Sequence, residues 1–410
     1  MSVEIRVVPE DRYAECLRSS EIAFSETMED DLIGRVQALG DRERFICALD
    51  GGQIVGTSGV FTQCLSVPGG EVAAGAVTFV TVLPTHRRRG LMSGMMRMMI
   101  DDCHGRGEPI AMLWASEASI YQRFGYGMAT SSYNLEAETR AISYTQDWPR
   151  QGHVRLVPAG EGMDLVDPVY QLARSQRAGF LMRDERWWPG SLPNPEKDKR
   201  GGEIRRLAVY ETQDGIEGFA VYKTKGEWNV RGASFTVVVD EAFGSTPRGT
   251  REIWRFLFEV DLARTLKTWR LPGDHPIFSL VSEPRRLGTT MGDGLWIRII
   301  DVADALEARS YGTGEHAGGS VAFELADAYC PWNAGRYRLD VTDGRGQVTR
   351  TNGDPDFALD ANDLGAMYLG EASASALSLA GRVTEMKPGG LVRADGLFTT
   401  ALRPWCPQEF

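Results

Sequence analysis

The sequence predicts a mixed α/β protein with several domains. Its 410 residues are too many for one ordinary hydrophobic core and suggest two to four domains. The first 150 residues alternate short β-branched strands with amphipathic helices, which is typical of a mixed sheet covered by helices. The charged and apolar fractions, 25% and 42%, are those of a soluble globular protein.

The first predicted domain covers residues 1–150. Its elements follow from apolar residues that recur at strand or helix spacing, and Asp50-Gly51-Gly52 between two alternating strands predicts a hairpin. We expect a strand at residues 3–8, helices at 11–20 and 26–39, and the two hairpin strands at 44–49 and 53–63. A central motif at residues 77–126 follows, and a strand at 133–137 then closes the same sheet.

The central motif starts with a β-branched, apolar strand at residues 77–83. Residues 91–105 then repeat apolar side chains at helical spacing, with polar side chains opposite them. The arginine turn (residues 87–90, Arg-Arg-Arg-Gly) therefore lies at a helix N-terminus, where free backbone N–H groups and the helix dipole suit a pyrophosphate. A solvated basic turn or a nuclear localisation signal is the alternative, but the position between a buried strand and an amphipathic helix favours the phosphate site.

This motif resembles the acyl-CoA site of the GNAT acetyltransferase superfamily, whose phosphate turn follows Gln/Arg-x-x-Gly-x-Gly/Ala. Arg87-x-x-Gly90-x-Met92 matches except at the last position, where Met92 stands in place of a small residue. Three ordered motifs are similar to one branch of the superfamily, the Eis (enhanced intracellular survival) family: VTVLPTHRRRGL at 80–91, ASE at 115–117 and IYQRFGYG at 120–127.

The resemblance implies an acetyl-CoA site and a proton donor. An open strand can pair with the pantetheine arm, and one of its N–H groups can donate to the thioester oxygen. Tyr121 matches the family pattern Tyr-x-x-x-Gly and is the implied general acid, with a core aromatic as its alternative, whereas Tyr126 is interpreted as packing. The implied donor-binding residues are Phe79, Val80, Val82, Arg87, Arg88, Gly90, Leu91 and Ser116.

The base and the amine side are also implied by the family. Members use the C-terminal carboxylate as the base, here that of Phe410, and an α-carboxylate is ionised at neutral pH. Some relatives carry a histidine where Trp114 stands, which leaves the terminal carboxylate or water as the base. Glu26 lies in an acidic stretch, so a solvated helix face is an equally good interpretation of it. The implied acceptor-binding residues are Phe24, Glu26, Trp114 and Glu409.

Two further domains are predicted after residue 150. Residues 151–298 contain several strands and a helix at 251–266, and resemble a second GNAT-like fold that has lost its phosphate turn. The stretch 293–309 looks like the entry to the third domain of the Eis family. Residues 299–410 resemble a sterol-carrier-like domain, which would supply the C-terminal carboxylate. The fold expected is therefore two tandem GNAT-like domains followed by a sterol-carrier-like domain.

Composition limits the partners. A net charge of −11 argues against nucleic acid and favours a cationic ligand. The N-terminus lacks a signal peptide and no apolar run is long enough to span a bilayer, so we expect a cytoplasmic protein. The five histidines and six cysteines show no metal-ligand spacing, so no metal is predicted.

Together these features predict an acetyl-CoA-dependent N-acetyltransferase that acts on polycationic amines. The resemblance implies aminoglycosides as the acceptor class, acetylation at several positions and a homo-oligomer, a hexamer. Protein lysines or polyamines are alternative acceptors. Two alternatives from other classes are a lipid or small-molecule carrier and an acidic docking protein without turnover.

Overall fold

The computed structural model describes residues 3–25, 27–194, 204–230, 232–312 and 318–410. The chain forms two compact units. The first consists of Met1–Ala129, Leu295–Ala401 and Glu409–Phe410, and the second of Thr130–Gly294 and Leu402–Gln408. The predicted mixed α/β architecture is confirmed, because three mixed sheets with covering helices occur in the described residues.

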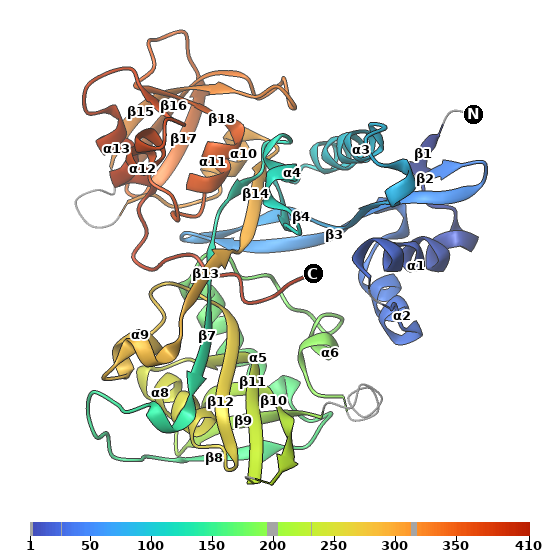
Figure 1. Cartoon of the computed structure of the whole chain (residues 1–410). Helices are drawn as coiled ribbons and strands as arrows, with labels where there is room; N and C mark the ends of the chain where they lie inside the picture. Colours follow the sequence, from blue (N-terminus) through green and yellow to red (C-terminus); the bar gives the residue numbers. More distant parts are fainter. Residues whose placement is uncertain (1–2, 26, 195–203, 231, 313–317) are drawn as a thin grey trace. The chain divides into compact units, whose positions relative to one another are not determined.

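The first sheet belongs to the first unit. Helices α1 (Tyr13–Phe24) and α2 (Asp30–Leu39) lie on one side of it and α3 (Leu91–Gly105) on the other (Figure 1). Helix α4 (Ala118–Gln122) follows the fifth strand. In the described residues the strand order is β1 (Glu4–Val7), β2 (Phe45–Asp50), β3 (Gln53–Val67), β4 (Gly70–Val82), β5 (Ile110–Trp114), β14 (Leu295–Ile299) and β6 (Gly127–Met128).

The strand that completes the first sheet differs from the prediction. We expected residues 133–137 there, but β7 (Ser131–Glu138) pairs with β12 (Ala263–Leu271) and β13 (Thr290–Asp293) in the sheet of the second unit. β14 instead pairs with β5. All five residues of β14 are buried, whereas β7 exposes residues at its C-terminal end, so only β14 has the near-continuous apolar run of a strand covered on both faces.

A smaller sheet, also in the first unit, follows β14. Its strands contain both buried and exposed residues, which indicates a sheet with one covered face. Helix α13 was not predicted, because two glycines in nine residues weaken its helical signal. The order in the described residues is β17 (Arg345–Arg350), β16 (Gly335–Thr342), β15 (Gly319–Ala326), β18 (Phe357–Asp360) and β19 (Thr384–Glu385), with helices α10 (Val302–Glu307), α11 (Ala361–Met367), α12 (Ala374–Leu379) and α13 (Gly390–Phe398).

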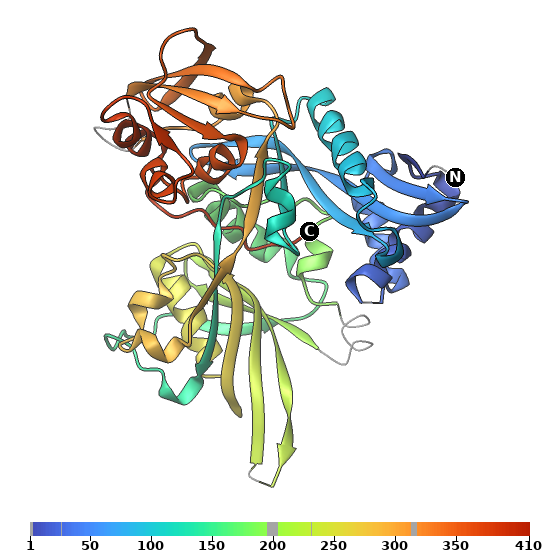
Figure 2. The same ribbon diagram turned by 45° about the horizontal axis from the view of Figure 1, so that its top comes forward.

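The second unit contains one sheet, in the order β13, β7, β12, β11, β10, β9 and β8 within the described chain. β10 and β11 form a long antiparallel hairpin (Figure 2). The remaining elements are β8 (His153–Val157), β9 (Arg205–Thr212), β10 (Gly215–Asn229), β11 (Gly232–Gly244), α5 (Met163–Gln176), α6 (Trp188–Ser191), α8 (Pro247–Phe258) and α9 (Ile277–Leu280).

The helix predicted at residues 251–266 is wrong in its second half. Helix α8 ends at Phe258, and from Ala263 the chain forms β12, parallel to β11. Leu262, which lies within the predicted helix, is 55% exposed and has a left-handed φ of 66°. A helix cannot continue through that backbone conformation, so the strand begins directly after it.

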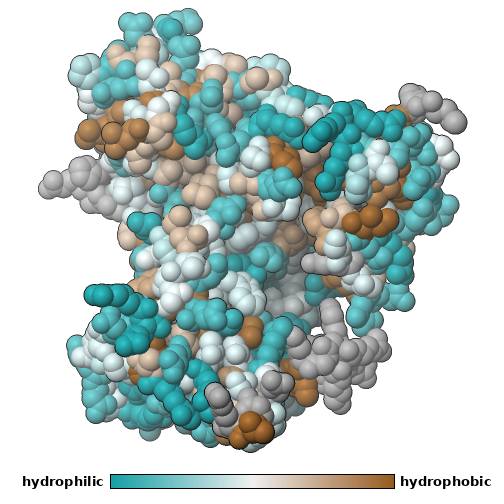
Figure 3. All heavy atoms as spheres, in the orientation of Figure 1, coloured by the Kyte–Doolittle hydropathy of each residue, from teal (hydrophilic) through white to brown (hydrophobic). Residues whose placement is uncertain are grey.

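Apolar side chains are exposed over α12 and α13 of the first unit (Figure 3). Leu379 is 93% exposed and Val392 is 71% exposed. Large apolar side chains that face solvent on two neighbouring helices mark a surface that a partner can cover. None of the helices in the described ranges is long and apolar enough to cross a membrane.

Candidate active site

The candidate site lies where β4 and β5 separate. The two strands pair in parallel only between residues 74–76 and 110–112. At residues 79–80 a bulge shifts the register of β4 against β3, and Phe79 adopts a left-handed φ of 51°. The Phe79 carbonyl accepts a hydrogen bond from Thr57 Oγ1 at 2.7 Å, which holds the bulge. In the described structure, residues 77–82 therefore have no ladder partner on the β5 side.

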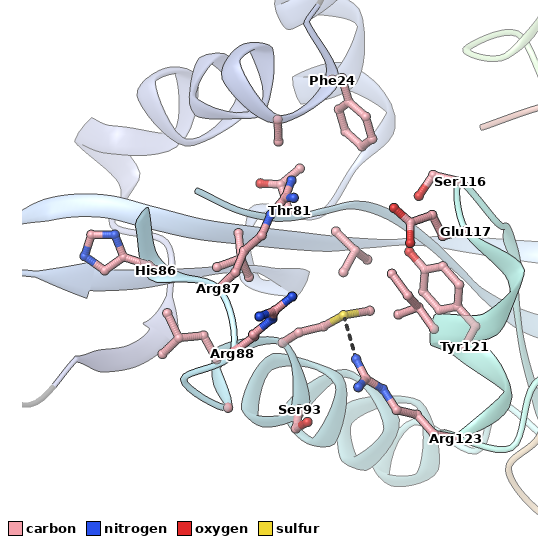
Figure 4. Close-up of a pocket in the computed structure, with 17 residues that line it drawn as sticks. Phe24, Thr81, His86, Arg87, Arg88, Ser93, Ser116, Glu117, Tyr121 and Arg123 are labelled. Atoms are coloured by element: carbon pink, nitrogen blue, oxygen red, sulfur yellow. Dashed lines mark hydrogen bonds between the residues drawn. The ribbon is translucent and has the colours of Figure 1, made fainter. Parts of the chain in front are cut away.

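A cavity of about 690 Å³ opens at this divergence. Its walls come from β4, the arginine turn, the first turn of α3 and the segment that contains α4 (Figure 4). This volume is in the usual range of small-molecule sites, roughly 300 to 1,000 Å³. The predicted residues that line it are Phe24, Val80, Val82, Arg87, Arg88, Gly90, Leu91, Ser116 and Tyr121.

The arginine turn presents uncompensated positive charge to the cavity. Gly90 caps α3 with a left-handed φ of 79°, and no side chain caps the first N–H groups of the helix. Asp50 Oδ2 lies 3.6 Å from Arg89 Nη1, so the carboxylate compensates the positive charge of that arginine. Arg87 and Arg88 have no ion-pair partner among the described residues, and both guanidinium groups point into the cavity (Figure 4). Free amides and two unpaired cations at a helix N-terminus suit an anionic ligand.

Tyr121 faces the cavity from α4 (Figure 4). Its side chain is only 5% exposed. Burial raises the pKa of the Tyr121 phenol above its ordinary value, a hydrogen bond with Ser116 opposes that rise, and the Glu117 carboxylate adds to it. The phenol is therefore protonated at neutral pH and can donate a proton. Tyr126 lies 6.1 Å away, ring centroid to ring centroid, and is fully buried in the core, as expected for a packing residue.

The C-terminal residue belongs to the first unit and lies beside β4. Thr78 Oγ1 donates a hydrogen bond to a carboxylate oxygen of Phe410 at 3.1 Å. Thr78 immediately precedes the bulged Phe79, so the terminal carboxylate is held at the part of β4 that leaves β5. Glu409 is also in this unit.

Not every predicted residue lines the cavity. Among those that the structure describes, Phe79 turns its ring toward Phe45, with centroids 6.2 Å apart. Trp114 ends β5, where its backbone pairs with Leu295 of β14. Neither side chain lines the cavity, and Phe410 and Glu409 are not among its lining residues either. Glu26 lies outside the described residues.

Eight of the lining residues were not predicted as site residues, and two of them, Glu117 and Arg123, are charged residues next to α4. Glu117 precedes α4, and Arg123 follows it and brings a third guanidinium group into the cavity (Figure 4). Arg123 Nη2 donates to Met92 Sδ at 3.6 Å, so the methionine that replaces a small residue is itself part of the wall. Both residues stand inside the quoted motifs, but nothing in the sequence showed where their side chains point. Within the described ranges, no group of three or more His, Cys, Asp or Glu residues could hold a metal ion.

In the second unit, helix α8 also follows a long strand of its sheet, but its N-terminus differs from that of α3. Thr246 caps α8, and Glu217 from β10 lies against the same turn. The Glu217 carboxylate accepts hydrogen bonds from Thr246 Oγ1 at 2.7 Å and from Arg248 Nε at 3.0 Å. The bond with Arg248 is the main reason why the pKa of Glu217 falls to about 2. This helix N-terminus already has an anionic partner from the chain, unlike the start of α3, and this agrees with the predicted loss of the phosphate turn in residues 151–298.

Family models match three parts of the chain. Residues 4–129 match an acetyltransferase (GNAT) domain, residues 179–299 match a second acetyltransferase (GNAT) domain and residues 302–407 match a sterol carrier protein domain. These matches confirm the two GNAT-like folds and the sterol-carrier-like fold.

Whole-chain relatives give the same result. An uncharacterized N-acetyltransferase of Streptomyces avermitilis is 39% identical over 379 residues, which cover 91% of each chain. N-acetyltransferase Eis of Mycobacterium tuberculosis is 33% identical over 368 residues, 88% of this chain and 87% of that protein. The crystal structure of Eis1 from Mycobacterium abscessus matches with a TM-score of 0.85 and 29% identity, over 99% of this chain and 100% of that one.

Proposed function

Because the chain belongs to the Eis family of GNAT N-acetyltransferases, we propose that it transfers acetyl groups from acetyl-CoA to amines of polycationic acceptors such as aminoglycosides. GNAT acetyltransferases use acetyl-CoA as the acyl donor, and acetyl transfer to amines is the family's activity. The observation that carries the proposal is the cavity at the divergence of β4 and β5. It combines an open strand edge, two arginines of the arginine turn without an ion-pair partner in the described residues, and a buried tyrosine.

Donor binding follows from the two walls of the cavity. Arg87 and Arg88, with the α3 amides after Gly90 and at Leu91, would hold the pyrophosphate. The free backbone edge at Val80 and Val82 would pair with the pantetheine arm as a strand does. Phe79 would contribute through its backbone in the bulge, and Ser116 through the wall next to Tyr121.

Transfer needs one proton removed and one supplied. As the amine nitrogen bonds to the carbonyl carbon and the C–S bond breaks, the Tyr121 hydroxyl would give its proton to the departing sulfur. The carboxylate of Phe410 would accept the proton that the amine loses. The hydrogen bond from Thr78 supports this role, because it holds the carboxylate beside the open strand edge.

The acceptor class rests on charge and on the family. A formal net charge of −11 favours a cationic ligand, and Phe24 lines the cavity with a 43% exposed side chain that can cover an acceptor. Glu409, Glu26 and Trp114 remain predicted acceptor contacts. Polyamines and protein lysines are alternative acceptors with the same amine chemistry, and several acetylated positions remain a prediction.

Other predictions complete the proposal. We retain three domains, 1–150, 151–298 and 299–410, with the donor site in the first. A hexamer and a cytoplasmic location stay predictions from the resemblance and the composition. The exposed apolar side chains on α12 and α13 support self-association. A carrier or docking protein without turnover is the alternative function.

The proposal is tested by release of CoA thiol from acetyl-CoA in the presence of single amines. Aminoglycosides, polyamines and a lysine peptide are compared at equal amine concentration. We expect release that depends on the amine, with aminoglycosides fastest, and mass spectrometry should show a gain of one or more acetyl groups on the acceptor. Absence of release with every amine would favour the carrier or the docking protein.

Arg88→Ala should raise KM for acetyl-CoA about 10- to 100-fold and leave kcat nearly unchanged. Hydrogen bonds to charged groups contribute about 1.5 to 3 kcal/mol, and the arginine is expected to contact the same phosphate before and during the reaction. Arg89→Ala is the matched control, because Arg89 is compensated by Asp50 and does not line the cavity. An equal rise in both variants would show that the turn acts only through its net charge.

A further inference from the structure

One segment of the sterol-carrier-like domain, residues 327–333, contacts the helices of the candidate site. Its base is a buried ion pair in which Arg298 Nη2 of β14 donates to both carboxylate oxygens of Asp327 at 2.7 Å. The backbone N–H of Cys330 donates to the same carboxylate at 2.8 Å. Asn333 Nδ2 donates to the Ile300 carbonyl at 3.0 Å, so both ends of the segment are attached to β14 or the residue after it.

Tyr329 of this segment contacts α3 at its first turn. Its hydroxyl donates a hydrogen bond to the Ser93 carbonyl at 2.8 Å. Ser93 lines the cavity and lies two residues after Leu91, the first residue of the helix. The Arg97 guanidinium lies 3.9 Å from the centre of the Tyr329 ring and donates to the Tyr329 carbonyl. The tyrosine is therefore held against the end of α3 that faces the arginine turn.

The same tyrosine contacts the turn that ends α4. Phe124 packs edge-on against its ring, with centroids 5.1 Å apart. The Phe124 N–H donates to the Tyr121 carbonyl at 3.0 Å, so Phe124 belongs to the backbone turn that carries the proposed acid. At the next residue of this turn, a Cβ on Gly125 would lie 2.4 Å from Arg298 Nη1. The turn therefore contacts Tyr329 through Phe124 and approaches Arg298 closely at Gly125.

We propose that Tyr329 is a positioning residue that couples the two walls of the donor cavity, and that this coupling is what the sterol-carrier-like domain contributes to acetyl transfer. The inference rests on the proposed function of the cavity. The hydroxyl of Tyr329 fixes the first turn of α3 and so affects donor binding. Its ring fixes Phe124 and, through the α4 turn, the direction of the Tyr121 hydroxyl.

The two contacts predict different kinetic effects. Tyr329→Phe keeps the ring and removes the bond to Ser93, so Kd and KM for acetyl-CoA should rise about 3- to 10-fold while kcat stays within about twofold. Tyr329→Ala removes both contacts, so kcat should also fall about 10-fold, as small displacements of a catalytic group produce large losses. Compared with Tyr329→Ala, the Tyr329→Phe variant should therefore recover kcat but not the affinity for acetyl-CoA.

Tyr368→Phe is the matched control. Tyr368 is a buried tyrosine of the same domain whose hydroxyl donates to a backbone carbonyl, that of Ala305, at 2.9 Å. Its loss should lower Tm with unchanged Kd, KM and kcat. The inference is overturned if Tyr329→Phe and Tyr329→Ala lower Tm in the same way without the predicted split. Calorimetric Kd values for acetyl-CoA need no acceptor, so weaker binding in Tyr329→Phe supports the inference even where no amine is acetylated.

Discussion

Tyr121→Phe is expected to lower kcat about 10²- to 10⁴-fold, the usual contribution of a general acid, and to leave the Kd for acetyl-CoA within about twofold. The ring remains and only the proton donor is removed. Without that proton the sulfur leaves as a thiolate, which raises the barrier of the bond-breaking step. The measurement is steady-state release of CoA thiol, with donor affinity determined separately by calorimetry.

Tyr126→Phe is the control for this variant. It makes the same chemical change 6.1 Å away, at a fully buried side chain whose hydroxyl has no hydrogen-bond partner in the described structure. We expect its kcat to stay within about twofold of wild type, because removing an unpaired buried hydroxyl costs little. Equal losses in both variants, or full activity of Tyr121→Phe, would contradict the assignment of Tyr121 as the acid.

The pH profile of kcat gives a second test of the same residue. Burial raises the pKa of the Tyr121 phenol, so the protonated, active form persists to higher pH than for a tyrosine in water. The alkaline decline of kcat should therefore lie above about pH 10, the ordinary tyrosine value. A decline centred well below that value would assign the donated proton to another group.

The lining of the candidate donor site could be predicted in large part from sequence because most of it is local. One stretch contains the strand, the arginine turn and the helix, and each has its own signal in charge, glycine or apolar spacing, whereas the acid role proposed for Tyr121 in the same stretch came from the family resemblance. Arg87, Arg88 and Tyr121 do line one cavity in the structure. The turn required no knowledge of distant residues, since helix geometry alone places its amides and its charges together.

The features that sequence could not show depend on distant pairing or on irregular backbone. The place of β14 beside β5 joins segments that are far apart in the chain. The apolar run of β14 indicates a strand that is covered on both faces, but it does not show with which strand β14 pairs. The bulge in β4 reverses the alternation that strand periodicity assumes, so Phe79 turns toward Phe45 instead of the cavity. The sequence shows that residue 123 is an arginine but not that its side chain points into the cavity, because that direction depends on contacts with Met92 and Phe124.

The terminal residue is an intermediate case. Its role came from the resemblance alone, because most chain ends are frayed and carry no signal for a site. The hydrogen bond from Thr78 to Phe410 adds an independent physical reason for the assignment. A free α-carboxylate that is held beside the open edge of β4 is suited to accept a proton there.

Extension of the chain beyond Phe410 should therefore lower kcat about 10²- to 10⁴-fold while acetyl-CoA still binds. A few added residues convert the terminal carboxylate into a peptide carbonyl, which cannot act as a base at neutral pH. The measurement compares kcat and the calorimetric Kd for acetyl-CoA between the native and the extended chain. Phe410→Ala is the control, because it changes the side chain but keeps the carboxylate, and it should retain far more activity than the extended protein.

Thr78 gives a subtler test of the same carboxylate. Thr78→Val removes the hydrogen-bond donor with little change in shape, and we expect kcat to fall about 5-fold, as for loss of one hydrogen bond of about 1 kcal/mol. Thr78→Ser keeps a hydroxyl group and should restore kcat. Full activity of the extended chain would remove the carboxylate from the mechanism. An active extended chain together with a slow Thr78→Val variant would make Thr78 important for the shape of the β4 bulge and not for the base.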